Sequence, residues 1–135
     1  MLSHITVLGA GTMGHGIAQV AAQAGFTVTL RDVAQGILDR AVQTVRANLD
    51  KGVEKGKLDR AVADRALANL SVTTDLAKSV ERADIVIEAI PERMDLKTAT
   101  VKEVFAAGKQ GLVFATNTSS LSVTEIAAAA PDPSR

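Results

Sequence analysis

A glycine-rich turn near the start of the chain limits its fold more than any other feature. The apolar run ITVL at residues 5–8 leads directly into GAGTMG at residues 9–14, and Asp32 follows eighteen residues later. In a strand–turn–helix unit with GxGxxG spacing, the first glycine permits the tight turn and the second lets an anionic ligand approach the backbone. The third glycine lets the helix pack closely on the strand. An acid about 20 residues further on can accept hydrogen bonds from ribose hydroxyls. The combination predicts a βαβ unit that binds a dinucleotide.

The composition is typical of one globular domain that binds neither nucleic acid nor membrane. With 135 residues, of which 47% are hydrophobic, the chain can bury a core of ordinary size. Fifteen basic residues balance fifteen acidic ones, so the net charge favours neither polyanions nor an anionic membrane. The absence of cysteine excludes disulfides and thiolate metal sites, and we predict no metal. Because the first apolar run breaks at glycines too early for a signal peptide, we expect a cytoplasmic location.

Strand and helix patterns alternate along the chain, as in a parallel sheet covered on both faces. After the first strand we expect strands at residues 26–31, 70–73, 84–89 and 112–115, and helices near residues 75–79, 93–107 and 123–129. The short apolar runs IVI (85–87) and LVF (112–114) predict strands buried on both faces. Ser122 and Glu125 have the spacing of a capping box at the start of the last helix. We therefore predict an α/β fold of the Rossmann type, with a doubly wound parallel sheet.

The connection between the second and third predicted strands is unusually long. Residues 32–69 lie between them, more than one crossover helix needs. Apolar residues recur there at helical spacing in two stretches separated by Gly52 and Gly56, which predicts an antiparallel helical hairpin. The turn of this hairpin carries mixed charges: Asp50, Lys51, Glu54, Lys55, Lys57, Asp59 and Arg60. Two interpretations remain open, a solvated hairpin tip and a contact for substrate phosphates.

Polar residues follow several of the predicted strands. Ligands of open α/β sheets bind beyond the carboxyl ends of the strands, so we expect Asp32, IPE at residues 90–92 and TNTSS at residues 116–120 to meet the glycine turn in one groove. Asn117 and Ser119 offer short donors and acceptors suited to a carboxamide, a ribose or a hydroxyl. Alternatively, residues 117–120 form only a turn and Glu92 only complements a helix dipole. We assign no chemistry to the two histidines, His4 and His15.

Three segments together resemble one enzyme family. GAGTMGHGIA (9–18), DIVIEAIPE (84–92) and FATNTSSL (114–121) are similar to segments of the 3-hydroxyacyl-CoA dehydrogenases, which include the bacterial 3-hydroxybutyryl-CoA dehydrogenases. The resemblance implies NAD as the cofactor, with Asp32 on the adenosine ribose. It implies cofactor contacts from Gly9, Ala10, Gly11, Thr12, Met13, Gly14, Ala89, Ile90, Glu92, Lys97, Asn117 and Ser119. Of these, Asn117 and Ser119 are expected at the reacting groups, and the resemblance places Asn48 and Lys55 of the hairpin on coenzyme A.

The resemblance also implies that part of the enzyme lies outside this chain. The family uses a histidine general base that neither His4 nor His15 matches. It also has further sheet strands and a C-terminal helical domain that contributes substrate contacts and forms a homodimer. We therefore interpret residues 1–135 as an NAD-binding domain truncated at its C-terminus, with the strand at 112–115 as an unprotected edge.

The predicted parent reaction is hydride transfer between C3 of an (S)-3-hydroxyacyl-CoA and NAD, a step of fatty acid metabolism that butyrate metabolism and aromatic degradation also use. Without the histidine, we expect this chain alone to bind NAD(H) but not to turn over the 3-hydroxyacyl-CoA substrate. Two alternatives remain from the residues themselves. One is another hydroxy-acid dehydrogenase built on the same N-terminal domain, and the other is a non-catalytic module that senses NAD(H).

Overall fold

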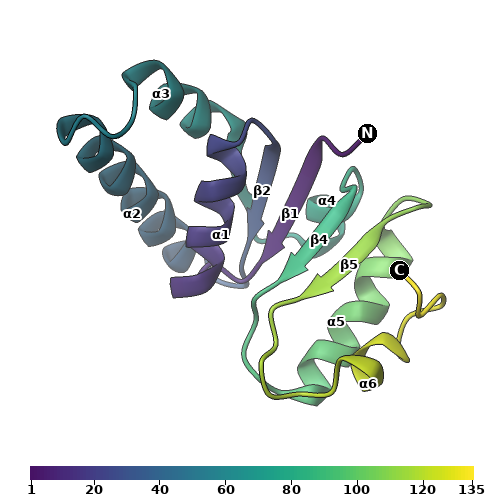
Figure 1. Cartoon of the computed structure of the whole chain (residues 1–135). Coiled ribbons are helices and arrows are strands. Elements are labelled where there is room, and N and C mark those ends of the chain that lie inside the picture. The colour runs from purple at the N-terminus through teal and green to yellow at the C-terminus, as the bar shows by residue number, and fades with distance from the viewer.

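The computed structural model describes residues 1–135 and contains a five-stranded parallel sheet between two layers of helices (Figure 1). The strands are β1 (His4–Leu8), β2 (Thr27–Arg31), β3 (Leu70–Thr73), β4 (Ile85–Glu88) and β5 (Val113–Thr116). The helices are α1 (Thr12–Gln23), α2 (Gln35–Glu54), α3 (Arg60–Asn69), α4 (Leu76–Val80), α5 (Met94–Ala107) and α6 (Val123–Ala127). The predicted α/β class and the alternation of elements are confirmed.

The strand order β3-β2-β1-β4-β5 places the first strand in the centre of the sheet. The chain adds β2 and β3 on one side of β1, and it then crosses to the other side of β1, where it adds β4 and β5. The order reverses between β1 and β4, and ligands of such sheets bind beyond the carboxyl ends of the strands at this point.

The two faces of the sheet have separate cores. On one face, β1 and β2 pack against α1, α2 and α3 through a cluster that includes Val7, Leu30 and Leu49. On the other face, α4 and α5 cover a smaller cluster around Leu8, Val86 and Val104. Alternate residues of β1 serve the two cores because successive side chains in a strand point to opposite faces.

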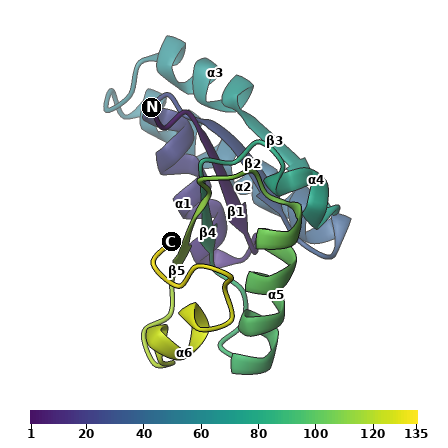
Figure 2. The same ribbon diagram turned by 90° about the vertical axis from the view of Figure 1, so that its right-hand side faces the viewer.

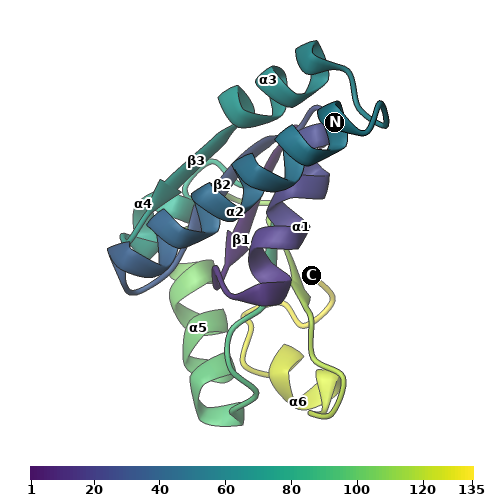
Figure 3. The same cartoon turned by 90° about the vertical axis from the view of Figure 1, so that its left-hand side faces the viewer.

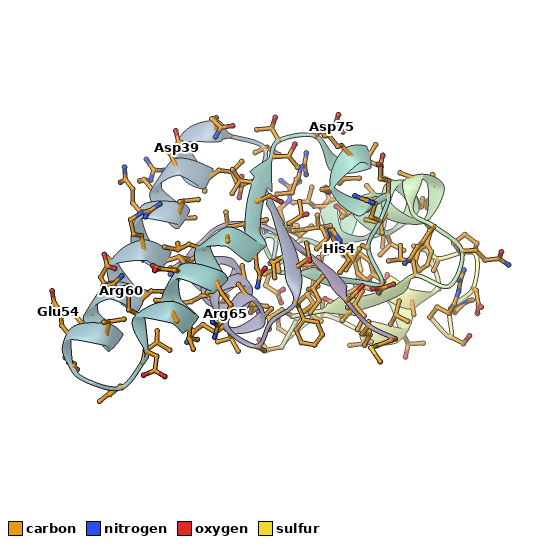
Figure 4. All side chains as sticks on the ribbon, turned by 90° about the horizontal axis from the view of Figure 1, so that it is seen from above. His4, Asp39, Glu54, Arg60, Arg65 and Asp75 are labelled. Carbon is orange, nitrogen blue, oxygen red and sulfur yellow. The ribbon has the colours of Figure 1, made fainter.

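The predicted helical hairpin is present as α2 and α3 (Figure 3). The buried side chains of α2 recur at helical spacing, and this stripe faces the core shared with α1 and the sheet. Gly56 makes the turn with a φ of +69°, a conformation that other residues rarely adopt. In the view from above, Glu54 and Arg60 mark this turn at one extremity of the molecule (Figure 4).

The helix signals were accurate to about one residue at most ends. Asp75 caps α4 by accepting a hydrogen bond from Lys78 N, and Ser122 caps α6 by accepting one from Glu125 N. Strands β4 and β5 differ from their predicted ranges by one residue at each end, as expected where strands merge into loops.

The prediction that the strand around Val113 is buried on both faces is wrong. Val113 and Ala115 are exposed, and they lie on β5, the last strand of the sheet. The expectation of a bare edge also needs correction. Phe114 N donates a 2.7 Å hydrogen bond to Arg135 O, so the C-terminal segment returns alongside β5 (Figure 2). No helix has both the length and the apolar character needed to cross a bilayer.

Candidate functional site

A groove of about 870 Å³ runs across the carboxyl ends of β1, β2, β4 and β5. Ten of the predicted site residues line it: Gly9, Gly11, Thr12, Met13, Asp32, Ala89, Ile90, Glu92, Asn117 and Ser119. They come from four loops that are far apart in the sequence. Parallel strands bring these loops together because all their carboxyl ends lie at one edge of the sheet.

The glycine turn between β1 and α1 is closely packed at its first and third glycines. Gly9 has a φ of +97°, and a Cβ there would lie 2.5 Å from the carbonyl oxygen of Ala89. A Cβ on Gly14 would lie 1.6 Å from the carbonyl oxygen of Gly9. Only glycine permits this approach of α1 to β1 and of the turn to the loop after β4.

The middle glycine faces open space. A Cβ built on Gly11 meets no atom within 4 Å, and Gly11 is the N-cap residue of α1. No side chain caps this helix, and its first turn contains no acidic residue. The first amides of α1 are therefore available to an anion, and the helix dipole favours negative charge at this point. The turn fits the pyrophosphate of a dinucleotide.

Asp32 is held in the groove by backbone amides. Its Oδ2 accepts a 2.9 Å hydrogen bond from Ala10 N, and its Oδ1 accepts one of 2.7 Å from Val33 N. Both carboxylate oxygens have further lone pairs for ribose hydroxyls. The neighbouring Arg31 also lines the groove, where its Nε donates to the carbonyl oxygen of Thr74 at 3.0 Å.

A buried ion-pair network lies behind the groove where β4 ends. Lys97 Nζ lies 2.6 Å from Glu88 Oε2 and 2.8 Å from Glu92 Oε1. Lys97 and Glu88 are fully buried, whereas the Glu92 side chain keeps 42% of its surface exposed and lines the groove. Burial opposes the charge on Lys97, but the hydrogen bonds to Glu88 and Glu92 outweigh that cost and raise the pKa of Lys97.

The network extends into the loop after β5. Glu88 Oε1 accepts a 2.7 Å hydrogen bond from Thr116 Oγ1, and Glu92 Oε2 accepts bonds from Thr118 Oγ1 and Ser120 Oγ at 2.7 and 2.8 Å. The hydrogen bonds from Lys97, Thr118 and Ser120 lower the pKa of Glu92 to about 2. The loops after β4 and β5 are thus joined beside Asn117 and Ser119.

The sequence patterns assigned no role to Glu88, and they placed Thr116 only within the polar segment at residues 116–120. Glu88 is the last residue of a buried strand, and an acid at such a position requires partners. The sequence shows an acid at the end of an apolar strand, but it does not show which residues are the partners of that acid. Glu88 pairs with Thr116 in the β4–β5 register, which brings their side chains together across 28 residues of sequence.

Several predicted residues do not line the groove. Lys97 lies behind the wall of the groove, where it pairs with the groove-lining Glu92. Ala10 and Gly14 are buried in the glycine turn. Asn48 and Lys55 belong to the hairpin, where Asn48 Nδ2 donates to Gln19 Oε1 of α1 at 3.1 Å. Lys55 is the C-cap residue of α2, at the exposed turn.

The two histidines lie outside the groove lining. His15 Nδ1 lies 2.7 Å from the carbonyl oxygen of Gly11 and therefore donates to it, and His4 pairs with Thr29 at the opposite edge of the sheet. Burial lowers the pKa of His4. The groove lining therefore contains no histidine side chain.

The central β1–α1 turn, the acid after β2 and the groove across the switch point together define a dinucleotide-binding domain of the Rossmann type. Comparison with known proteins agrees. The family model described as 3-hydroxyacyl-CoA dehydrogenase, NAD binding domain, matches residues 4–135, and the chain belongs to this family.

Individual relatives share both sequence and structure with this chain. It is 40% identical over 131 residues to a 3-hydroxyadipyl-CoA dehydrogenase of Escherichia coli, covering 97% of this chain and 27% of that protein. It is 38% identical over 131 residues to a 3-hydroxybutyryl-CoA dehydrogenase of Clostridioides difficile, covering 97% and 46%. The crystal structure of an (S)-3-hydroxybutyryl-CoA dehydrogenase from Ralstonia eutropha matches with a TM-score of 0.93 and 35% identity, covering 98% and 47%. The chain thus spans less than half the length of these relatives.

Proposed function

We propose that residues 1–135 form the NAD-binding domain of an NAD-dependent 3-hydroxyacyl-CoA dehydrogenase and bind NAD(H) across the groove. The observation that carries the proposal is the continuous groove from Asp32 to Ser119 past an uncapped helix N-terminus. Family membership adds the identity of the cofactor. When bound, NAD supplies the hydride acceptor, and the protein supplies binding and orientation.

Each part of the groove has a role in this proposal. The amides at the start of α1 hold the pyrophosphate, and Asp32 accepts hydrogen bonds from the adenosine ribose. The nicotinamide half then extends over β4 and β5, toward Glu92, Asn117 and Ser119. Asn117 and Ser119 orient the carboxamide and the substrate oxygen at the reacting centre. A further set of residues completes the wall of the groove: Ala89, Ile90, Thr12 and Met13.

We further propose that the substrate is a 3-hydroxyacyl-CoA and that the hairpin contacts its coenzyme A part. The relatives named above act on CoA esters according to their names. Lys55 at the exposed turn and Asn48 on α2 would meet the nucleotide portion, since an exposed ammonium group suits phosphate. We also propose that the protein is located in the cytoplasm and that the complete protein forms a homodimer.

We further propose that the general base of the reaction is supplied from outside residues 1–135. The groove is lined by no histidine, and neither histidine of the chain reaches it. We therefore expect the 135-residue chain to hold the cofactor without multiple turnovers of acetoacetyl-CoA. Proton transfer from a placed base contributes roughly 10²–10⁴-fold to such rates.

Calorimetric titration of the chain with NADH and, in parallel, NADPH tests this proposal. We expect one-to-one binding of NADH, clearly tighter than NADPH, because Asp32 repels a 2′-phosphate. A folded chain that binds neither nucleotide would contradict the proposal. Acetoacetyl-CoA added to the NADH complex should leave the absorbance of NADH at 340 nm unchanged. Steady oxidation of NADH would contradict the proposed inactivity of the isolated chain.

A further inference from the structure

The ion-pair network behind the groove does not balance its charges. Two carboxylates, Glu88 and Glu92, share one ammonium group, that of Lys97. The remaining partners of the carboxylates are neutral: the Ile90 amide and the hydroxyls of Thr116, Thr118 and Ser120. The network therefore carries one surplus negative charge.

The surplus charge reaches the groove through Glu92. Glu88 and Lys97 are fully buried, so they present no charge directly to a ligand. Glu92 is 42% exposed and lines the groove beside Ile90 and Asn117. Arg93, the next residue, does not neutralise it, because its guanidinium pairs with Asp95 at 2.7 Å.

The charge of a nicotinamide ring depends on its oxidation state. The ring is cationic in NAD⁺ and neutral in NADH, and the rest of the dinucleotide is the same in both. A fixed carboxylate near the ring therefore attracts the oxidised form more strongly than the reduced form. Because the amides at the start of α1 and Asp32 face the other half of the groove, the end formed by the loops after β4 and β5 receives the nicotinamide.

We infer that the Glu88–Lys97–Glu92 network tunes the redox preference of the site, by favouring NAD⁺ over NADH relative to a neutral network of the same shape. Glu92 supplies the field at the groove, and Glu88 is the positioning residue that occupies Lys97 and so leaves part of the Glu92 charge uncompensated. The inference rests on the proposed function, since it requires a nicotinamide cofactor in this groove.

The test compares dissociation constants for NAD⁺ and NADH in variants of the 135-residue chain, measured by calorimetry at pH 7. Glu92→Gln and Glu88→Gln each remove one negative charge while keeping the shape of the side chain. Glu103→Gln is the matched control, because it removes the same charge from the exposed side of α5, where no ion pair or hydrogen bond involves its carboxylate. Thermal unfolding by circular dichroism establishes that each variant is folded.

We expect the ratio of the NADH constant to the NAD⁺ constant to fall roughly 10-fold in Glu92→Gln, mainly through weaker NAD⁺ binding. Glu88→Gln should move the ratio in the same direction, and Glu103→Gln should leave it unchanged. A purely structural role would weaken both forms equally. If Glu88→Gln does not fold, the test of the inference rests on Glu92→Gln alone, because the Glu92 side chain of the wild type is partly exposed.

An unchanged ratio in folded Glu92→Gln, within about twofold, would overturn the inference while leaving the proposed function intact. An equal shift in Glu103→Gln would also overturn it, because the effect would then follow net charge and not position. Wild-type protein that binds neither form would overturn the proposed function and this inference with it.

Discussion

The carboxylate of Asp32 accepts a hydrogen bond from the backbone N–H of Ala10, at 2.9 Å. The acid at the end of β2 is thereby tied to the glycine turn at the end of β1. The backbone adds a second link, because Gly9 N donates to the carbonyl oxygen of Arg31 at 2.8 Å. The two halves of the motif, which lie apart in the sequence, are thus joined at one edge of the groove.

This relationship predicts that Asp32 acts on cofactor binding and on choice between cofactors. Asp32→Asn should weaken NADH binding about 10-fold, because hydrogen bonds to a charged acceptor are stronger than those to a neutral one. It should also narrow the gap between NADH and NADPH, since the repulsion of a 2′-phosphate disappears. Calorimetric titration with both nucleotides measures the two effects. Asp39→Asn, an exposed acid on α2, serves as the control and should change neither. An undiminished preference for NADH in Asp32→Asn would contradict this role.

The close approach of Gly14 to Gly9 predicts a large difference between two similar substitutions in α1. Gly14→Ala should destabilise the protein by about 3 kcal/mol or more, because the new Cβ overlaps the Gly9 carbonyl oxygen. Gly16 lies two residues further along the same helix, and a Cβ built on it meets no atom within 4 Å. The substitution Gly16→Ala should therefore stabilise the helix by about 0.5–1 kcal/mol. Urea unfolding of both variants gives the free energies. Equal unfolding free energies for the two variants would contradict this prediction, because the turn would then relax around the methyl group added at Gly14.

The buried pair of Lys97 and Glu88 predicts a strong effect from removing one partner. Lys97→Met leaves the Glu88 carboxylate buried without its counter-charge, and we expect a loss of about 3–5 kcal/mol. Lys102→Met, on the exposed side of α5, should stay within about 0.5 kcal/mol of the wild type. The measurement is again chemical denaturation. A Lys97→Met protein as stable as Lys102→Met would mean that Glu88 takes up a proton without cost.

The lowered pKa of Glu92 predicts a dependence of stability on acid pH. The hydrogen bonds from Lys97, Thr118 and Ser120 lower the pKa from 4.5 to about 2 in the folded protein. A lowered pKa stabilises the fold above the unfolded value, and this stabilisation is lost as the pH falls through the folded value. The contribution of Glu92 should therefore disappear between pH 4.5 and about pH 2.

Urea unfolding of wild type and Glu92→Gln across this range isolates the effect. The difference in unfolding free energy between the two proteins should be constant above pH 5 and shrink as the solution is acidified. Asp84 should add to the acid sensitivity of both proteins equally. Its pKa is lowered by hydrogen bonds, first from Lys109 and then from the amides of Ser3 and His4. A difference that does not change with pH would show that Glu92 has an ordinary pKa in the fold.

Local patterns in the sequence determined most of the framework of this protein. The apolar run before the glycines, the acid after β2 and the helical spacing in the long connection each act within a few residues. Their outcomes are β1, α1, β2 and the α2–α3 hairpin, close to where they were expected. The meeting of the loops at one edge of the sheet followed from a general rule for parallel sheets.

The tertiary structure alone decided how the buried charge network behind the loops after β4 and β5 is built. Glu88 meets Thr116 only because β4 and β5 pair in a register that no local signal specifies. The burial of Lys97 likewise depends on how α5 packs against that edge, since a lysine on a helix is by default solvated. Periodicity reports which face of an element is apolar, and it carries no information about which distant polar groups will share a buried charge.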